Sequence, residues 1–221
     1  MNIIPVSIVD NFLPNPDKIR EWALTLNYKP DPQGHWPGTR SDEISNINRP
    51  FYDFFCKRYF SLFWDVRNDP LTWDSNLGFQ KTTKDYGSGW VHSDGQISQL
   101  TAIVYLNPNP APNSGTSIMK LKDPTVLPKP EWHDAKRRQI LGERNNPELA
   151  KIQEQANSIY EESIRVNNVY NRLITFDAHM HHAAHDYLGG KDNEERLTLV
   201  MFVNRIVTPR GPIIRSQSIL Q

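Results

Sequence analysis

Short runs of strand-forming residues, separated by turn residues, make up most of the chain from residue 71 onward, and this pattern limits the possible folds. Consecutive short strands are typical of an antiparallel sandwich or barrel, whereas the strands of a parallel sheet are separated by helical crossovers. The sequence therefore predicts a mainly β core. The runs are 71–83, 89–94, 99–106, 115–121, 173–176, 180–185 and 196–206.

One segment, residues 122–164, interrupts the β pattern. It begins with prolines and then becomes highly charged, and β-type sequence resumes directly after it. We therefore expect an insertion between two strands of the core, and insertions of this kind frequently lie over a binding site and select the substrate. Within it, residues 147–164 predict a helix, because apolar side chains recur at helical spacing at Leu149, Ile152, Ala156 and Ile159.

The first 70 residues predict a helical support for this core. Residues 3–9 alternate as a strand does, and Asn15-Pro16-Asp17 combines a helix cap, a proline at the first helical position and an acidic first turn. A second helix with an aromatic stripe is predicted from Pro50. Residues 28–48 contain several prolines and glycines without a sustained period, which predicts an irregular loop.

The length and charge of the chain narrow the function classes. A chain of 221 residues fits a single domain, because two domains would both be small. We expect residues 1–70 as N-terminal helical support, 71–121 and 165–207 as core, and 122–164 as insertion, all within one domain spanning 1–221. The 25 basic and 25 acidic side chains cancel, so no overall field attracts nucleic acid or an anionic membrane.

The amino terminus and the single cysteine bear on the cellular setting. The terminus lacks a basic leader, and its apolar run is broken by Pro5 and Asp10, which predicts neither a signal peptide nor a membrane span. Cys56 lies in an aromatic run and is expected to be buried, and no disulfide can form within a chain that has one cysteine. A reducing cytoplasm is therefore the expected setting.

The candidate chemistry begins with His92-Ser93-Asp94. Side chains two residues apart on an extended chain point to the same face, so His92 and Asp94 can be directed at one point. Alone, the triplet is weak evidence, because short patterns frequently arise by chance and a structural role for His92 is the simpler interpretation. Further histidines follow the run 173–176 and offer a third ligand: His179, His181, His182 and His185.

Two imidazoles and one carboxylate leave coordination positions open. That arrangement suits non-haem Fe(II) enzymes, which must bind a co-substrate and oxygen. A zinc site and a polar barrel rim are the alternatives. Structural zinc favours four closed ligands, usually with thiolates, and a chain with one cysteine cannot supply these.

Arg196 opens an apolar, alternating run. If Leu197, Leu199 and Met201 pack to one side, Arg196 and Thr198 point to the other, and a guanidinium stands beside a hydroxyl inside a barrel. A buried, unpaired arginine is costly, whereas one that holds a carboxylate through two parallel hydrogen bonds is satisfied. The alternative is a surface arginine at the start of a strand.

Taken together, several segments resemble the Fe(II)/2-oxoglutarate-dependent dioxygenases, and within them the prolyl-hydroxylase-like branch with its small phage and bacterial members. The resemblance covers most of the chain and is weakest in the insertion. It implies a double-stranded β-helix, a jelly-roll or cupin-like core with flanking helices. The segments that carry it are His92-Ser93-Asp94, VDNFLPNPDKIREWAL (9–24), PGTRS (37–41), TAIVYLN (101–107), GTSIMKL (115–121), NRLITFDAHMHHAA (171–184) and RLTLVMF (196–202).

The resemblance implies that His92, Asp94 and His182 ligate iron. Members of the branch often read Phe-Asp-Gly/Ala, three residues, and then His with a small residue, and this pattern falls on Phe176-Asp177-Ala178 and His182-Ala183. It therefore selects His182 as the distal ligand. The remaining histidines become surrounding or surface groups: His179, His181 and His185.

The resemblance further implies the co-substrate and the reaction. Arg196, with Thr198 and Tyr105, would bind the distal carboxylate of 2-oxoglutarate. The cofactors expected are Fe(II), 2-oxoglutarate and O2, and the reaction is hydroxylation of a C–H bond with release of succinate and CO2. The substrate is a small molecule or a protein side chain, chosen by residues 28–48, where His35 and Trp36 flank the site, and by the insertion. The resemblance to phage and bacterial members is consistent with a cytoplasm, that of a bacterium or of a phage host.

Three alternatives stay open from the sequence. A cupin-type metal dioxygenase would use the same ligands without 2-oxoglutarate. A non-catalytic metal-binding or structural protein would carry a vestigial site. A nucleic-acid demethylase would need a basic, aromatic groove, and the short cluster Lys136-Arg137-Arg138 is instead expected on a solvated helix face.

Overall fold

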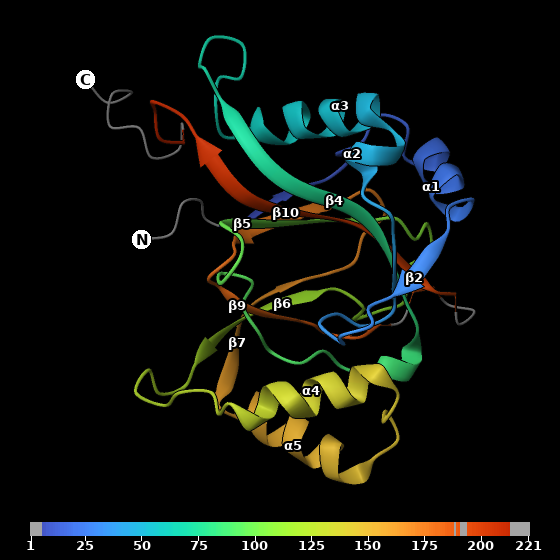
Figure 1. Cartoon of the computed structure of the whole chain (residues 1–221), viewed down its shortest axis with the longest axis vertical. Helices are drawn as coiled ribbons and strands as arrows, with labels where there is room; N and C mark the ends of the chain where they lie inside the picture. The colour runs from blue at the N-terminus through green and yellow to red at the C-terminus, as the bar shows by residue number, and fades with distance from the viewer. Residues whose placement is uncertain (1–5, 188, 191–193, 213–221) are drawn as a thin grey trace.

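Two antiparallel sheets face each other in the computed structural model, which describes residues 6–187, 189–190 and 194–212 (Figure 1). The larger sheet contains, in spatial order, β1 (Ser7–Val9), β8 (Leu173–Asp177), β5 (Leu100–Tyr105), β10 (Arg196–Val207), β4 (Thr72–Thr82), β3 (Thr39–Ser41) and β2 (Tyr28–Pro30). The smaller sheet contains β7 (Tyr160–Val166), β6 (Thr116–Leu121) and β9 (His181–Ala184). The predicted mainly β core is confirmed.

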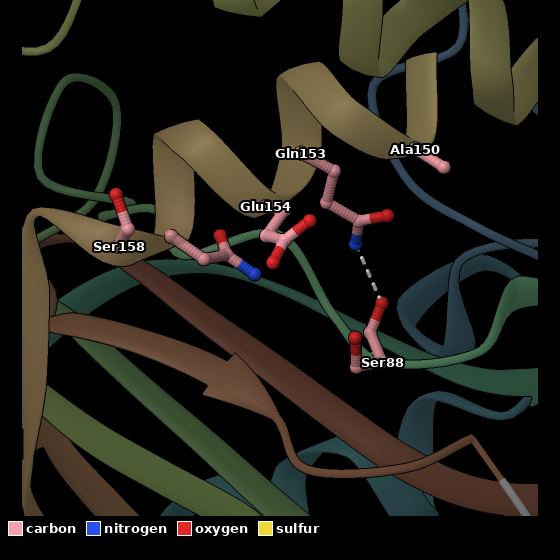
Figure 2. Close-up of a pocket in the computed structure, with 6 residues that line it drawn as sticks. Ser88, Ala150, Gln153, Glu154 and Ser158 are labelled. Atoms are coloured by element: carbon pink, nitrogen blue, oxygen red, sulfur yellow. Dashed lines mark hydrogen bonds between the residues drawn. The ribbon is translucent and has the colours of Figure 1, made fainter. Parts of the chain in front are cut away.

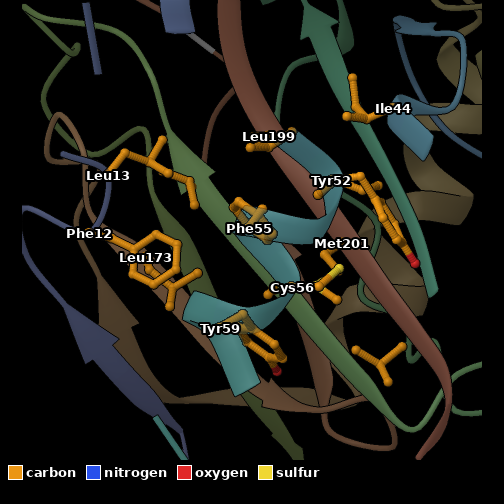
Figure 3. Close-up of a cluster of buried hydrophobic side chains, with 14 of the residues drawn as sticks. Phe12, Leu13, Ile44, Tyr52, Phe55, Cys56, Tyr59, Leu173, Leu199 and Met201 are labelled. Carbon is orange, nitrogen blue, oxygen red and sulfur yellow. The ribbon is translucent and has the colours of Figure 1, made fainter. Parts of the chain in front are cut away.

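Helices cover the outer face of the larger sheet. They are α1 (Pro16–Leu24), α2 (Ile44–Ile47) and α3 (Arg49–Phe60), drawn above the sheet in Figure 1. The predicted aromatic stripe of α3 packs on this sheet, with Phe55, Cys56 and Tyr59 fully buried (Figure 3). The Tyr59 hydroxyl also hydrogen-bonds to Thr175 Oγ1 of β8 at 2.7 Å. Each such aromatic side chain contributes about 2 kcal/mol through burial, so this layer fixes the larger sheet in place.

Alternation along β10 gives the larger sheet an apolar outer face and a polar inner face. Leu199 and Met201 belong to the helix-covered core, together with Leu197 and Val203. Because successive side chains of a strand point to opposite faces, Arg196 and Thr198 face the smaller sheet. The alternation predicted for this run is therefore observed, and it places a cation between the two sheets.

Two further helices lie on the side of the smaller sheet (Figure 1). They are α4 (Glu131–Leu141) and α5 (Pro147–Ser158), and they pack around Trp90 with Ala135, Leu149 and Ala156. A 3-10 helix, η1 (Lys84–Tyr86), follows β4. Among the described residues, no helix is both long and apolar enough to cross a bilayer.

The helix predicted over residues 147–164 is confirmed as far as Ser158 and is wrong after it. α5 ends at Ser158, and residues from Tyr160 form β7, which pairs with β6 in the register Leu121 with Tyr160 and Thr116 with Val166. The helical spacing continues through Ile159, but hydrogen bonding to a strand some 40 residues earlier decides the conformation after that point. The insertion therefore contributes a strand to the smaller sheet as well as two helices.

The irregular loop predicted for residues 28–48 is confirmed over residues 31–38 and wrong on either side of them. β2 and β3 extend the larger sheet beyond β4, and α2 follows them. Each strand has only three residues, too few to give a recognisable alternation in a segment rich in proline and glycine. In contrast, the predicted strand over 89–94 is reduced to an isolated bridge between His92 and His182. The start of the predicted run 3–9 lies outside the described residues.

Candidate metal centre

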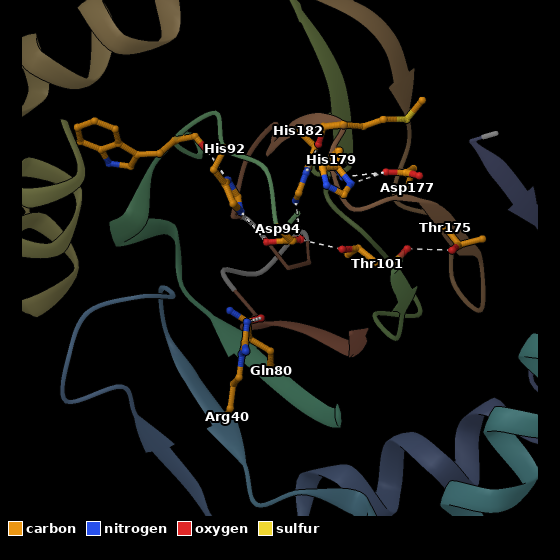
Figure 4. Close-up of polar contacts among 11 residues, drawn as sticks. Arg40, Gln80, His92, Asp94, Thr101, Thr175, Asp177, His179 and His182 are labelled. Carbon is orange, nitrogen blue, oxygen red and sulfur yellow. Dashed lines mark hydrogen bonds and ion pairs between the residues drawn. The ribbon is translucent and has the colours of Figure 1, made fainter. Parts of the chain in front are cut away.

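His92, Asp94 and His182 meet between the two sheets (Figure 4). One ligand atom from each lies within 4.8 Å of the others. His92 Nε2 is 3.8 Å from Asp94 Oδ1, and His182 Nε2 is 3.4 Å from Asp94 Oδ2. These are the three side chains that the sequence predicted as metal ligands, and the fold brings them together from positions about 90 residues apart.

Backbone pairing fixes the relative position of the three side chains. His92 N donates to His182 O at 3.0 Å, and His182 N donates to His92 O at 2.8 Å. Asp94 N donates to Ala178 O at 2.8 Å, four residues before His182, which holds the carboxylate beside the two imidazoles. Directly paired residues in an antiparallel ladder project from the same face, so the two imidazoles lie side by side, with ring centroids 4.4 Å apart.

Each imidazole has its donor nitrogen fixed by a backbone carbonyl. His92 Nδ1 bonds to Trp90 O at 2.8 Å, and His182 Nδ1 bonds to Met180 O at 3.0 Å. A carbonyl oxygen only accepts, so Nδ1 carries the proton in both rings and Nε2 presents a lone pair. Both Nε2 atoms face Asp94. Metal-binding histidines are commonly oriented in this way, with one ring nitrogen bonded to a backbone carbonyl and the other free for the metal.

Protonation in the site also suits a cation. Burial lowers the pKa of His92 well below its ordinary value, and the charges of Lys136 and His182 lower it further. Burial alone would raise the pKa of Asp94, but the two histidines and a 2.8 Å hydrogen bond from Thr101 Oγ1 lower it overall. A neutral imidazole and an ionised carboxylate are the forms that bind a metal.

The other histidines lie elsewhere. His179 has 69% of its side chain exposed and contacts Asp177 Oδ1 through Nδ1 at 3.1 Å. His181 points away from His182 on β9 and packs on Tyr160, with ring centroids 4.8 Å apart. His185 donates its backbone N–H to Gly115 O. Among the described residues, the geometry therefore selects His182 from the four candidates.

A second polar group surrounds Arg196. Its side chain is buried beside Tyr105 and Tyr187, with Cζ 5.4 Å and 5.9 Å from the two ring centroids. Thr198 pairs directly with Tyr105 in the sheet, and Tyr105 Oη donates to Thr116 Oγ1 at 2.7 Å. The structure thus brings together Arg196, Thr198 and Tyr105, the three residues predicted to bind the co-substrate.

Two buried polar atoms in this group have no hydrogen-bond partner among the described residues. They are Arg196 Nε and the hydroxyl of Thr82, and the two residues pair directly across β10 and β4. Leaving such atoms unsatisfied costs about 1–3 kcal/mol each. A bound carboxylate accepts from both a guanidinium and a hydroxyl, so a small acidic ligand fits the group. No local pattern in the sequence points to Thr82 or Tyr187 as part of this group.

The insertion helices hold the segment that leads to His92. Gln153 of α5 donates to Ser88 O at 2.8 Å, as Figure 2 shows, and Asn157 bonds to Gly89 O at 3.0 Å. Asn157 Oδ1 also accepts from Val91 N at 2.9 Å. The hollow between α5 and Ser88 is lined by small and polar side chains and lies away from the metal ligands. These contacts position residues 88–91, and through them the first ligand.

Two further cations lie near Asp94, and no local pattern in the sequence assigns either of them to the site. Arg40 of β3 extends toward Asp94 in Figure 4. Lys136 of α4 is partly buried and its charge lowers the pKa values of both His92 and Asp94. The prediction that Lys136 sits on a solvated helix face is therefore wrong, although Arg137 and Arg138 beside it are exposed.

Comparison with known proteins identifies the sequence family of the chain and solved structures with a similar fold. A family model described as a family of unknown function, DUF6445, matches residues 2–203. No curated protein matches the sequence. HygX from Streptomyces hygroscopicus, solved with nickel and 2-oxoglutarate bound, has a TM-score of 0.55 at 13% identity, over 90% of this chain and 83% of that chain.

Two more solved structures share the architecture. EvdO2 from Micromonospora carbonacea var. aurantiaca, complexed with 2-oxoglutarate, has a TM-score of 0.55 at 12% identity, over 95% of this chain and 90% of that chain. A prolyl hydroxylase from Trichoplax adhaerens has a TM-score of 0.50 at 11% identity, over 90% and 83% of the two chains. The fold is that of the Fe(II)/2-oxoglutarate-dependent oxygenases, and the predicted double-stranded β-helix core is confirmed.

Proposed function

The chain belongs to DUF6445, a family of unknown function, and we propose that it is an Fe(II)- and 2-oxoglutarate-dependent oxygenase that hydroxylates a C–H bond. One observation carries the proposal. Two oriented imidazoles and an ionised carboxylate converge on one point between the sheets, while a buried guanidinium with an unpartnered nitrogen lies on β10, on the inner face of the larger sheet. The fold shared with HygX and EvdO2 supports this assignment.

The donor set fits ferrous iron. His92, Asp94 and His182 would hold the metal through two nitrogens and one oxygen, which leaves positions open for other ligands. Arg196 would bind the distal carboxylate of 2-oxoglutarate, with Thr198 and Tyr105 beside it. The hydroxyl of Thr82 is a further donor to the same carboxylate, because it lies directly across the sheet from Arg196.

When bound, iron and 2-oxoglutarate would supply the oxidation, in which O2 gives one oxygen atom to the substrate and one to succinate as CO2 leaves. The groups of the protein itself orient the metal ligands and keep water out of the site. The carbonyls of Trp90 and Met180 keep both imidazoles in one tautomer, and Thr101 holds one oxygen of Asp94. Phe176 packs on the His182 ring, with centroids 4.7 Å apart, and helps to exclude water.

Anaerobic titration tests the proposal without knowledge of the substrate. The protein free of metal is titrated with Fe(II) and then with 2-oxoglutarate, and the visible charge-transfer band of the chelate is recorded. We expect the band in the native protein and in the control variants His181→Gln and Arg205→Gln, whose side chains lie outside the site. His182→Gln should abolish the band, and Arg196→Gln should raise the apparent dissociation constant of 2-oxoglutarate roughly 100-fold.

The alternatives give different results in the same titration. A cupin-type metal dioxygenase would bind Fe(II) but give no band with 2-oxoglutarate. In a following step, when air is admitted to the loaded protein, a non-catalytic protein with a vestigial site would consume neither oxygen nor 2-oxoglutarate. Absence of the band in correctly folded native protein contradicts the proposal. The substrate, a small molecule or a protein side chain, is not needed for either readout.

A further inference from the structure

Arg40 and Lys136 bring positive charge to the metal centre that neither the metal nor 2-oxoglutarate requires. They come from the two segments expected to select the substrate, β3 within residues 28–48 and α4 within the insertion. Figure 4 shows Arg40 and Gln80 directed toward Asp94 from the larger sheet.

The Arg40 side chain is held in one orientation, but not all of its N–H groups have a hydrogen-bond partner. Its Cζ lies 4.2 Å from the ring centroid of Trp36 and 5.1 Å from that of Phe202. Nη2 donates to Gln80 Oε1 at 3.3 Å, and Gln80 is itself held by Pro37 O at 2.7 Å. Nε is buried and has no hydrogen-bond partner in the part of the chain that the structure describes. The guanidinium is therefore preorganised, but not satisfied.

Lys136 is directed at the same region by the packing of α4. Ala135, the residue before it, is buried against Trp90, and Gln139, one turn later, accepts a hydrogen bond from the Trp90 indole. Residues three apart on a helix share a face, so Lys136 lies on the side that meets the segment leading to His92. Arg137 Nε also donates to Gln33 O at 2.9 Å, which ties α4 to the loop before Arg40.

Neither cation has a carboxylate partner within 4.0 Å among residues 6–187, 189–190 and 194–212. Burial lowers the pKa of Lys136 to about 8 and that of Arg40 to about 10, and the charge of Asp94 only partly opposes both shifts. Arg40 lowers the pKa of Lys136 further, so the two cations repel each other. An anion between them would relieve the repulsion and satisfy both.

The charges of the loaded site leave these two cations uncompensated. A divalent metal and Arg196 would be balanced by Asp94 and a doubly negative 2-oxoglutarate. Arg40 and Lys136 then add two positive charges in a partly buried site, where charges interact more strongly than in water. Asp31 and Glu43 also interact electrostatically with Arg40, but neither forms an ion pair with it among the described residues. An anionic substrate would therefore be a direct partner for both cations.

We propose that Arg40 and Lys136 bind an oxyanion of the substrate, a carboxylate or a phosphate, so that the oxidised molecule is acidic. This inference rests on the proposed function, since it assigns the substrate class of the same site. Arg40 offers its unpartnered Nε–H to the anion, and Lys136 adds an ammonium on a flexible side chain. Gln80 orients Arg40 and is a positioning residue.

Fluorine NMR with small probe anions tests the proposal. The protein is loaded anaerobically with paramagnetic Fe(II) and 2-oxoglutarate, and the ¹⁹F line widths of trifluoroacetate and monofluorophosphate are followed during titration. Trifluoroacetamide, which is neutral, serves as the reference. We expect saturable broadening with at least one anion and none with the amide, and the anion that binds more tightly identifies the carboxylate or the phosphate.

Substitutions identify the residues responsible. Arg40→Gln and Lys136→Gln should each weaken anion binding about tenfold or more, because each removes a charge-assisted hydrogen bond. Lys136→Arg keeps the charge and should retain binding, which guards against a mere folding defect. Arg138→Gln on α4 and Arg49→Gln on α3 remove exposed charges and should leave binding within about twofold of the native protein.

The outcomes separate this inference from the proposed function. If the charge-transfer band forms but no anion gives saturable broadening, or if Arg40→Gln and Lys136→Gln bind the anion normally, the inference is overturned and the oxygenase assignment stands. Loss of the 2-oxoglutarate band in Arg40→Gln would assign Arg40 to the co-substrate instead, and also overturns it. Failure of the band in the native protein overturns both.

Discussion

Lys136 occupies a position in which its charge lowers the stability of the folded protein. Lys136 is partly buried beside Arg40, and among the described residues it has no carboxylate within 4.0 Å. Burial is the main reason that its pKa falls from 10.5 to about 8, because the charged form loses its hydration. A residue that destabilises the folded chain without a structural partner is typical of a binding site, where ligand binding supplies the partner.

Replacing Lys136 by methionine should therefore stabilise the protein free of metal. Near neutral pH, Lys136→Met should raise the free energy of unfolding by roughly 1–2 kcal/mol, measured by urea denaturation. The unfolded state binds the lysine proton more tightly than the folded state, so the cost is fully present below about pH 8. The advantage of the variant should shrink as the pH rises from 8 toward 10.5.

The exposed neighbour Arg138 provides the control. Arg138→Met should change the free energy of unfolding by no more than about 0.5 kcal/mol, both near neutral pH and toward pH 10.5. The reason is that an exposed ion pair contributes little to the stability of a folded protein. If Lys136→Met destabilises the protein near neutral pH, or if its effect does not depend on pH, the account of Lys136 as an uncompensated cation is wrong.

At the scale of elements, the short strand β3 depends on a close backbone approach. Gly38 has φ +76°, and a Cβ at this position would lie 1.9 Å from Lys81 O and 2.8 Å from Thr82 Cγ2 of β4. Because it has no side chain, the chain can turn there and pair Thr39 with Lys81 and Arg40 with Gln80. The position of Arg40 in the site is thus a consequence of this glycine.

Gly38→Ala should separate β3 from β4, and Gly87→Ala is the matched control. Both residues have positive φ, but a Cβ at Gly87 would meet nothing within 4 Å. Both variants should lose about 1 kcal/mol of backbone stability, and Gly38→Ala should lose a further 1–3 kcal/mol, roughly, from the clash. Anion binding by ¹⁹F NMR should weaken only in Gly38→Ala, while Fe(II) binding is retained in both. Equal behaviour of the two variants would contradict this role of Gly38.

At the scale of the whole molecule, the metal ligands connect parts of the chain that are distant in sequence. His92 and Asp94 follow β4 of the larger sheet, whereas His182 belongs to β9 of the smaller sheet. The three ligand atoms converge only in the folded state. A metal that binds them should therefore stabilise the whole fold and not one segment.

Metal binding should raise the thermal midpoint of unfolding. At a free metal concentration about 100 times the dissociation constant, the gain is about 2.7 kcal/mol, or roughly 5–10 °C for a chain of this size. Mn(II), which does not oxidise in air as readily as Fe(II), is a suitable probe in differential scanning calorimetry, and EDTA should reverse the shift. His182→Gln should abolish the shift and His181→Gln should retain it; an equal shift in both would place the metal elsewhere.

Local patterns made much of this architecture predictable. The strand runs and the alternation of β10 follow from the two-residue period of a half-buried strand, which is a property of one segment alone. Likewise, the spacing of His92 and Asp94 predicts a shared face, and resemblance selected His182 from four histidines. The residues that could not be predicted are those whose role depends on a distant partner. They include Thr82, which pairs with Arg196 across the sheet, and Lys136, whose charge interacts with that of Asp94.

The sequence by itself determined the β-rich class of the fold, helices of the first 70 residues and the residue types able to bind a metal and a carboxylate, because each depends on local periodicity or side-chain chemistry. Only the tertiary structure decided that residues 160–166 form β7, that β3 extends the larger sheet, that Arg40 is directed at the metal centre and that the charge of Lys136 acts on it. These features depend on hydrogen-bond register and packing between segments far apart in the chain, and no local pattern encodes them.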